Sequence, residues 1–272
     1  MNRAALFALA CFLAVGCEDK TQPATPAPAP AAPVSGAAAA PASGAAAAPA
    51  SGAAAAPTGD KGEVQGTVTV TGKLPVMEDL KRQSDAFCAK KPMKDEAVIA
   101  GKKGELQNVI VHINGLPATP PPAEKASLSQ DDCMYRPRVQ GVVDGQKLEI
   151  RNGDPVLHNV HTYEGARTLF NVAQVPGTPN IEKTFTQNGV LLKFKCDVHQ
   201  WMTGFVWVQN NSYFAVTGAD GKFDIKDVPV GTWDIEAWHE RFGTKTGKVT
   251  VAKGKPAEVK FEFNGTETAA AK

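Results

Sequence analysis

After the first sixty residues, hydrophobic and polar side chains alternate at every second position along much of the chain. Residues 147–150 show this pattern, and in residues 215–225 two alternating runs flank an Asp-Gly turn. The period of two continues through residues 233–237 and 249–263. Period-two alternation bounded by Gly, Pro, Asn and Asp predicts half-buried β-strands. The folded part is therefore expected to be all-β, with a short helix only around residues 77–87.

The first residues follow a different pattern. One basic residue, Arg3, precedes an apolar run from Ala4 to Gly16. This run is too short to span a bilayer, which takes about 20 residues, and it is typical of a secretory signal peptide. It ends in Leu-Ala-Val-Gly-Cys, which resembles a bacterial lipoprotein cleavage box, so residues 1–17 are expected to be a signal peptide with Cys17 as the lipidated residue. Ordinary signal-peptidase cleavage is the alternative. Both place the protein in the periplasm or cell envelope.

Residues 18–61 are rich in Ala, Pro, Gly and Ser, and no charged side chain occurs from Thr21 to Gly59. Pro and Gly interrupt each alanine block before a stable helix of about 12 residues can form. We expect this segment to be a disordered tether, and residues 266–272 to be a short disordered tail.

Candidate chemistry is concentrated between Cys196 and Met202, where a thiol, the His199 imidazole and a thioether lie within a few positions of one another. Upstream, His158 supplies a second imidazole. A thiolate and two imidazoles with a weak axial Met are the ligand set that suits copper, whereas structural zinc generally draws on more Cys and His. Because this loop holds a single Cys, a two-thiolate binuclear centre is disfavoured. We expect one copper ion.

The flanking sequence strengthens this prediction. The segment His-Asn-Val-His at residues 158–161, followed far downstream by Cys-x2-His-x2-Met, resembles the pattern of blue copper proteins, or cupredoxins, with a short, amicyanin-like ligand loop. The resemblance covers residues 133–209 and implies a Greek-key β-sandwich over residues 119–210. It implies that the Asn159 side chain ties the two ligand-bearing loops together. The copper ligands that it implies are His158, Cys196 and His199 in the equatorial plane and Met202 in the axial position.

The same resemblance implies which ligand meets solvent. His199 would be partly exposed, with Pro155, Val156, Val198 and Trp201 forming an apolar rim around it. Electrons would leave through this rim.

The other histidines are expected to be structural. Residues two apart on a strand share a face, so His161 should point with Asn159 and away from the metal. His112 lies opposite the apolar face formed by Val109, Val111 and Ile113, and we expect it to be at the surface or hydrogen-bonded. His239 has no set of further potential ligands near it in the sequence.

Cysteine usage agrees with export. Cys11 would leave with the signal peptide, Cys17 would carry lipid and Cys196 would bind copper, which leaves Cys88 and Cys133. In an oxidising compartment this pair is expected to form a disulfide, and two free buried thiols are the alternative. The formal net charge of +1 gives no indication of a nucleic-acid partner.

Residues 211–265 resemble the carboxypeptidase regulatory-like, or transthyretin-like, β-sandwich. The signature is Gly-x-Phe-x-Ile from Gly221 and Val-Pro-x-Gly-x-aromatic from Val228. This segment is short for an Ig-like sandwich, which takes about 100 residues, and residues 62–118 are similar to that family's opening strands. We therefore hypothesise that the two segments form one sandwich with the copper domain inserted between them. Two consecutive domains are the alternative.

These observations predict an exported, lipid-anchored blue copper protein that carries single electrons between periplasmic redox partners and is not an enzyme. A protein that buffers, delivers or senses copper would use the same ligands. A cell-surface interaction module with a vestigial metal site is the second alternative.

Overall fold

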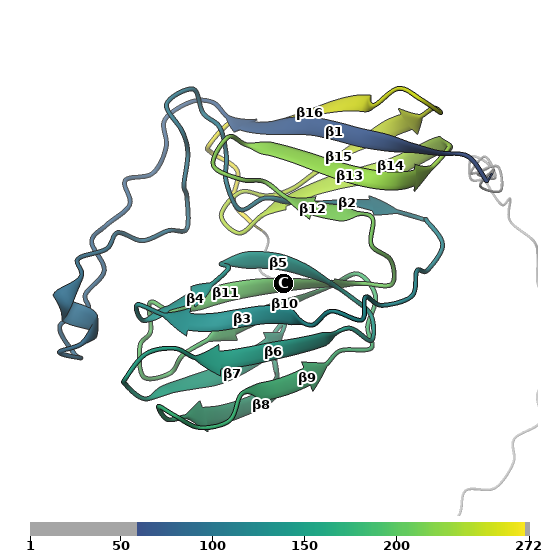
Figure 1. Ribbon diagram of the computed structural model, residues 1–272. Coiled ribbons are helices and arrows are strands. Elements are labelled where there is room, and N and C mark those ends of the chain that lie inside the picture. The colour runs from purple at the N-terminus through teal and green to yellow at the C-terminus, as the bar shows by residue number, and fades with distance from the viewer. Residues whose placement is uncertain (1–58, 270–272) are drawn as a thin grey trace, which may run out of the picture. The chain divides into compact units, whose positions relative to one another are not determined.

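The computed structural model describes residues 59–269. Within this range the protein is built of strands, with one 3-10 turn, η1 (Cys88–Lys90), and no α-helix, so the predicted all-β class is confirmed (Figure 1). No helix in this range is long and apolar enough to cross a membrane. The strands are β1 (Lys61–Val70), β2 (Ile110–Asn114), β3 (Ala126–Asp131), β4 (Met134–Arg136), β5 (Val139–Val143), β6 (Lys147–Asn152), β7 (His158–Glu164), β8 (Arg167–Gln174), β9 (Ile181–Thr184), β10 (Val190–Lys195), β11 (Thr203–Gln209), β12 (Phe214–Val216), β13 (Lys222–Pro229), β14 (Gly231–His239), β15 (Gly243–Val251) and β16 (Ala257–Phe263).

The signal peptide, Cys17 and nearly all of the predicted tether lie outside the described residues. At the other end of the chain, the N–H of Ala269 donates to the carbonyl of Arg241 at 3.0 Å. Residues 266–269 of the predicted tail are therefore attached to the folded part.

One sandwich is formed by two separate parts of the chain, and we call it the split sandwich. Its sheets have the strand orders β13-β1-β16 and β12-β2-β14-β15. Strand β1 runs parallel to β16, and Val68 and Val70 pair with Phe261 and Phe263. This is the strand pairing that the insertion hypothesis requires. Alternate residues of these strands face inward, including Val64, Val68, Ile225 and Ile235, and they bury an apolar core.

The remaining strands, β3 to β11, form a second sandwich that lies between β2 and β12 in the sequence, and we call it the inserted sandwich. Its sheets have the orders β4-β3-β6-β9 and β5-β11-β10-β7-β8. Figure 1 shows the strands of the two sandwiches as separate groups. Leu148 and Ile150 from one sheet pack with Leu192, Phe194 and Val206 from the other.

A third apolar cluster joins the two sandwiches. Ile110 and Trp238 of the split sandwich contact Val139, Phe205 and Trp207 of the inserted one. Strand β2 is therefore buried on both faces. Ile110 faces the inserted sandwich, and Val111 and Ile113 face the core of the split sandwich.

The double burial of β2 explains the position of His112. Its ring stacks on Trp207 with 4.3 Å between centroids, and its Nδ1–H donates to Asn114 Oδ1 at 3.1 Å. The expectation of a hydrogen-bonded His112 is confirmed, and a surface position is wrong, since the side chain is only 1% exposed.

A long loop joins β1 to β2, and we call its residues 74–98 the cover segment. The helix predicted around residues 77–87 is wrong. Backbone groups here pair across the loop instead, with Leu80 N–H donating to the Met93 carbonyl and Asp95 N–H to the Glu78 carbonyl, both at 2.8 Å. The cover segment is bonded to the inserted sandwich by the predicted disulfide, Cys88–Cys133, which is confirmed.

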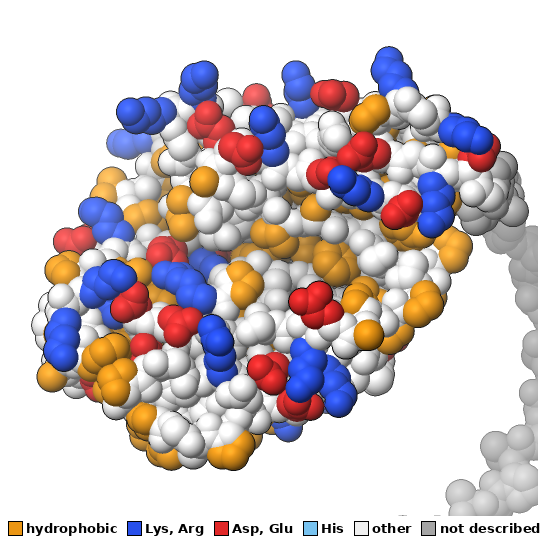
Figure 2. Space-filling view, viewed as in Figure 1, with side chains coloured by type: hydrophobic (Ala, Val, Ile, Leu, Met, Phe, Trp, Pro, Cys, Tyr) orange, Lys and Arg blue, Asp and Glu red, His pale blue; other side chains and the backbone are white. Residues whose placement is uncertain are grey.

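On the face drawn in Figure 2, basic side chains are interspersed with acidic ones. This face shows no basic stripe of the kind that follows a phosphate backbone.

Candidate metal centre

The loop from Cys196 to Met202 is the connection of a hairpin. Strands β10 and β11 pair antiparallel up to Lys195 and Thr203. Two backbone hydrogen bonds close the loop, from Cys196 N–H to the Met202 carbonyl at 3.4 Å and from Met202 N–H to the His199 carbonyl at 2.9 Å. The tight turn brings the three chemically active side chains to one end of the inserted sandwich.

The second histidine comes from the neighbouring strand. Strand β7 pairs with β10, with His161 opposite Lys195, so His158 at the start of β7 lies at the same end of the sheet as Cys196. The predicted role of Asn159 is visible here. Its side-chain oxygen accepts the N–H of Asp197 at 2.6 Å, and its own N–H donates to Cys196 Sγ at 3.4 Å.

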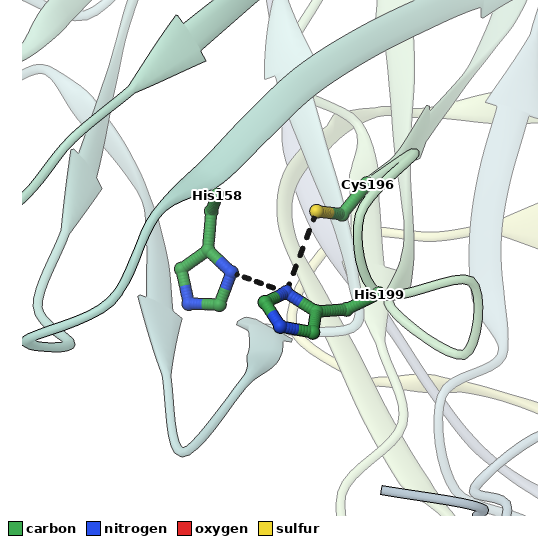
Figure 3. Close-up of side chains that lie close together, drawn as sticks. All are labelled: His158, Cys196 and His199. Carbon is green, nitrogen blue, oxygen red and sulfur yellow. Dashed lines mark hydrogen bonds between the residues drawn. The ribbon is translucent and has the colours of Figure 1, made fainter. Parts of the chain in front are cut away.

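Figure 3 shows the three side chains pointing toward one another, His158 from β7 and the other two from the hairpin loop. The Nδ1 atoms of His158 and His199 are 2.9 Å apart, and Cys196 Sγ lies 3.7 Å from His199 Nδ1. One sulfur and two imidazole nitrogens therefore converge on a single point. Two like-oriented ring nitrogens at this distance need a proton or a metal ion between them.

Asp154 fixes the orientation of His158. His158 Nε2–H donates to Asp154 Oδ2 at 2.9 Å, which directs Nδ1 at the other donors. The carboxylate also accepts the N–H groups of Asp132 at 2.8 Å and Cys133 at 2.7 Å. The sequence analysis missed this role, although the spacing of four residues between Asp154 and His158 was a usable signal.

His199 is oriented from the opposite side by the cover segment. Its Nε2 lies 3.9 Å from Asp85 Oδ2 and 3.6 Å from Cys88 Sγ. Asp85 also shapes the turn that carries Cys88, because its Oδ1 accepts the N–H groups of Phe87 and Cys88 at 2.8 and 3.1 Å. At 3.9 Å, Asp85 does not hydrogen-bond to Nε2 directly, but both contacts lie on the side of the ring away from Nδ1.

The prediction that His199 is partly exposed is wrong. The His199 side chain is 1% exposed, because the turn at residues 85–88 lies against it. The predicted rim does surround the site in part, with Val198 51% exposed and Trp201 half-buried. The Trp201 ring lies 5.1 Å from the His199 ring, and its indole N–H donates to the Cys133 carbonyl at 3.0 Å.

Electrostatics prepares the thiol to ionise. Burial by itself raises the pKa of Cys196, but hydrogen bonds from His158 and from the backbone of Asn159 outweigh burial, and the pKa lies below its ordinary value. Burial would lower the pKa of His158, yet its hydrogen bonds to Asp154 and Cys196 raise it. For His199, burial and then the neighbouring His158 charge lower the pKa. A thiolate beside a neutral imidazole is the state that binds a soft cation.

Met202, the predicted axial ligand, is fully buried and belongs to the same cluster as Cys196. Thioether, thiol and two imidazoles are thus all enclosed at one end of the inserted sandwich. This donor chemistry fits copper and does not match an oxygen-rich site for calcium or magnesium.

His161 lies outside this group, as predicted. Its Nδ1 is 3.0 Å from the Asp197 carboxylate, on the same face as Asn159, and its ring stacks on Tyr163. His239 is also structural. It is buried against Phe242, and desolvation, followed by the nearby Arg138 charge, lowers its pKa to about 3.

No protein-family model matches the chain, and no curated protein matches it. Solved structures are similar to part of it. A purple cupredoxin from Nitrosopumilus maritimus is 25% identical, covering 31% of this chain and 100% of its own, with a TM-score of 0.28. Amicyanin from Paracoccus versutus is 17% identical, covering 36% of this chain and 97% of its own, with a TM-score of 0.29. A copper-containing nitrite reductase from Thermus scotoductus is 20% identical and covers 35% of this chain but 24% of its own, with a TM-score of 0.29.

Proposed function

We propose that the protein binds one copper ion through His158, Cys196, His199 and Met202 and carries single electrons. The observation that supports this most directly is the convergence of the two Nδ1 atoms and the Cys196 sulfur, at 2.9 and 3.7 Å, in a buried position. When bound there, copper would supply one-electron redox chemistry, which no side chain of this set supplies alone.

The surrounding residues keep the donors in place. Asp154 and Asp85 occupy the Nε2 sides of the two imidazoles, and Asn159 joins β7 to the hairpin loop. Hydrogen-bond partners such as Asp154 and Asn159 orient metal ligands and tune their electronics. Donors that are fixed before an electron arrives need little rearrangement when it does, which favours a carrier.

Trp201 offers a route for electrons to the surface, since its half-buried ring contacts the enclosed His199. We propose that exported redox proteins dock at this end of the inserted sandwich and exchange electrons there. Export and a lipid anchor at Cys17 belong to the same proposal, and the sequence pattern of the first residues supports them. We propose no enzymatic turnover, because enclosed donors give a substrate no access to the metal.

Visible and electron paramagnetic resonance spectra of the full chain after addition of cupric ion and removal of the excess test this assignment. An intense thiolate-to-copper band with narrow copper hyperfine splitting would support it. A colourless protein with intact β-structure would overturn it and favour the surface-module alternative.

Copper buffering or delivery uses the same donors and differs in exchange rate. Burial of all four side chains, between 0 and 1% exposed, opposes rapid release. Loss of copper to a chelator within seconds would favour delivery, whereas retention with reversible redox cycling would favour the carrier.

A further inference from the structure

The His199 ring lies between two sulfur atoms. Its Nδ1 is 3.7 Å from Cys196 Sγ, and its Nε2 is 3.6 Å from Cys88 Sγ. The proposed ligand set uses only the first sulfur. The second belongs to the Cys88–Cys133 disulfide, so a single imidazole lies between the candidate copper centre and a disulfide.

Oxygen and nitrogen donors also surround the disulfide. Asp85, Cys88 and His199 form one group of potential ligands, and Cys133, Asp154 and His158 form another. Each group would gain a thiolate if the disulfide were reduced. Soft thiolate donors select cuprous copper over harder divalent ions.

The enclosed centre raises the question of how copper enters it. The cover segment lies against His199 and is covalently tied to Cys133. Of its residues, only Arg82, Cys88 and Val98 are buried. Its other ties to the inserted sandwich are polar, such as Arg136 donating to Glu96 at 2.5 and 2.8 Å, and segments with few buried apolar contacts open at low free-energy cost. Once its covalent tie is cut, this is the part of the site best suited to admit an ion.

We propose that Cys88 and Cys133, when reduced, form a second copper site that takes up a cuprous ion and passes it across the His199 ring to Cys196 and His158. This rests on the proposed copper function. The reductant is a dithiol, of the kind found in exported thiol–disulfide exchange proteins. One thiolate of the reductant attacks one sulfur of the disulfide, and the Cys88–Cys133 bond breaks. The second thiol of the reductant then resolves the mixed disulfide. Two electrons and two protons thereby reach the cysteine pair, and the reductant leaves as a disulfide.

Cuprous ion then displaces the two thiol protons and is held by two thiolates. The ion exchanges the Cys88 thiolate for the His199 imidazole and then for the Cys196 thiolate, and the Cys196 proton passes to the cysteine that is released, so the ion reaches the enclosed centre without release to solvent. An exchange with an oxidised dithiol protein re-forms the disulfide and restores the cover. The second site is thus a loading site, present only in the reduced chain.

The test compares the apo full chain in two forms, oxidised and reduced by a trialkylphosphine, under anaerobic conditions. Cuprous ion is supplied as a complex with a competing chelator, and copper per chain and the rate of uptake are measured. The reduced chain should bind one more ion than the oxidised chain and load about tenfold faster, since cutting the disulfide releases the cover segment and adds two thiolate donors. Equal stoichiometry in both forms would overturn the proposal. So would a disulfide that survives the phosphine, as counted by alkylation and mass.

Two variants separate the possible causes. Cys196→Ala removes the enclosed thiol and keeps the disulfide, so it should bind one ion when reduced and none when oxidised. Failure of this variant to bind any ion overturns the loading site, while the spectrum of the unmodified chain still decides the proposed function. The double variant Cys88→Ser, Cys133→Ser cuts the tie without supplying thiolates. It should take up copper more slowly than the reduced chain. Equal rates would show that release of the cover segment is sufficient without the two thiolates, and this would overturn the loading site.

Discussion

The two sandwiches are built by the same alternation of apolar and polar positions, yet they arrange their buried polar side chains differently. The split sandwich buries two histidines, His112 and His239, but none of the three-residue donor groups found among the described residues lies in it. The inserted sandwich encloses His158, His199, Asp154, Gln130 and Gln174 at one end. Buried polar groups are costly unless they are hydrogen-bonded, and here each is held by partners, such as Gln130 Nε2 donating to Gln174 Oε1 at 2.6 Å. Among the described residues, the candidate donor groups therefore lie in the inserted sandwich and in the cover segment that packs against it.

The sharpest test of that contrast is Cys196→Ala. Loss of the only described free thiol should abolish the copper-thiolate absorption completely, while the fold of both sandwiches is retained. Visible spectroscopy after copper addition, together with far-ultraviolet circular dichroism, checks both parts. His161→Ala is the matched control, because this residue contacts Asp197 and lies outside the donor group. Visible colour in Cys196→Ala would refute the ligand assignment.

The contact between the sandwiches can be broken at a buried ion pair. Arg138, just before β5, donates from Nε and from a terminal nitrogen to Glu240, just after β14, at 2.5 and 2.9 Å. The two side chains are 5 and 9% exposed. Glu240→Gln leaves the buried guanidinium with only the exposed Asp95 carboxylate, 3.9 Å away, and should lower the free energy of unfolding by about 3–5 kcal/mol.

The control for this prediction replaces both partners. Arg138→Met with Glu240→Leu leaves no unpaired charge and should cost much less than the single change. Urea unfolding of both variants measures the difference. If the double variant is as unstable as Glu240→Gln, packing and not charge is what the pair contributes.

How much of this organisation follows from the sequence depends on the range of the contacts. Three features were predicted: the ligand loop between Cys196 and Met202, the hydrogen-bonded tie from Asn159, and the disulfide. The first two follow from local sequence motifs and the third from counting cysteines. The turn at Asp85 and Cys88 was not connected to His199. The sequence around those residues shows no hydrophobic periodicity and no known motif. They reach the candidate metal centre only because a long loop that starts in the split sandwich brings them there. That non-local contact is what made the expected exposure of His199 wrong.

Acidification should affect the split sandwich through His239. Its pKa in the folded protein is about 3, well below the ordinary histidine value of 6.5, so the unfolded chain binds a proton that the folded chain does not. This contribution to stability is present above pH 6.5 and is lost as the pH falls toward 3, by about 1.4 kcal/mol for each pH unit. His239→Gln removes it. Between pH 7 and pH 5, the free energy of unfolding should therefore fall by about 2 kcal/mol more in the unmodified chain than in the variant. Parallel pH profiles would contradict this assignment.

The mildest change proposed here tests whether the inserted sandwich positions its donors or merely contains them. Asp154→Asn keeps the size of the side chain but replaces the carboxylate that accepts Nε2–H of His158 and the N–H groups of Asp132 and Cys133. Copper affinity should fall by about 10- to 100-fold, the usual effect of losing a ligand's hydrogen-bond partner. The reduction potential should rise, because His158 becomes a weaker donor to the cupric state. Competition with a chelator and voltammetry measure the two effects. Asp144→Asn, a carboxylate with no described contact to the donors, is the control, and equal affinities for the two variants would show that Asp154 only supports the fold.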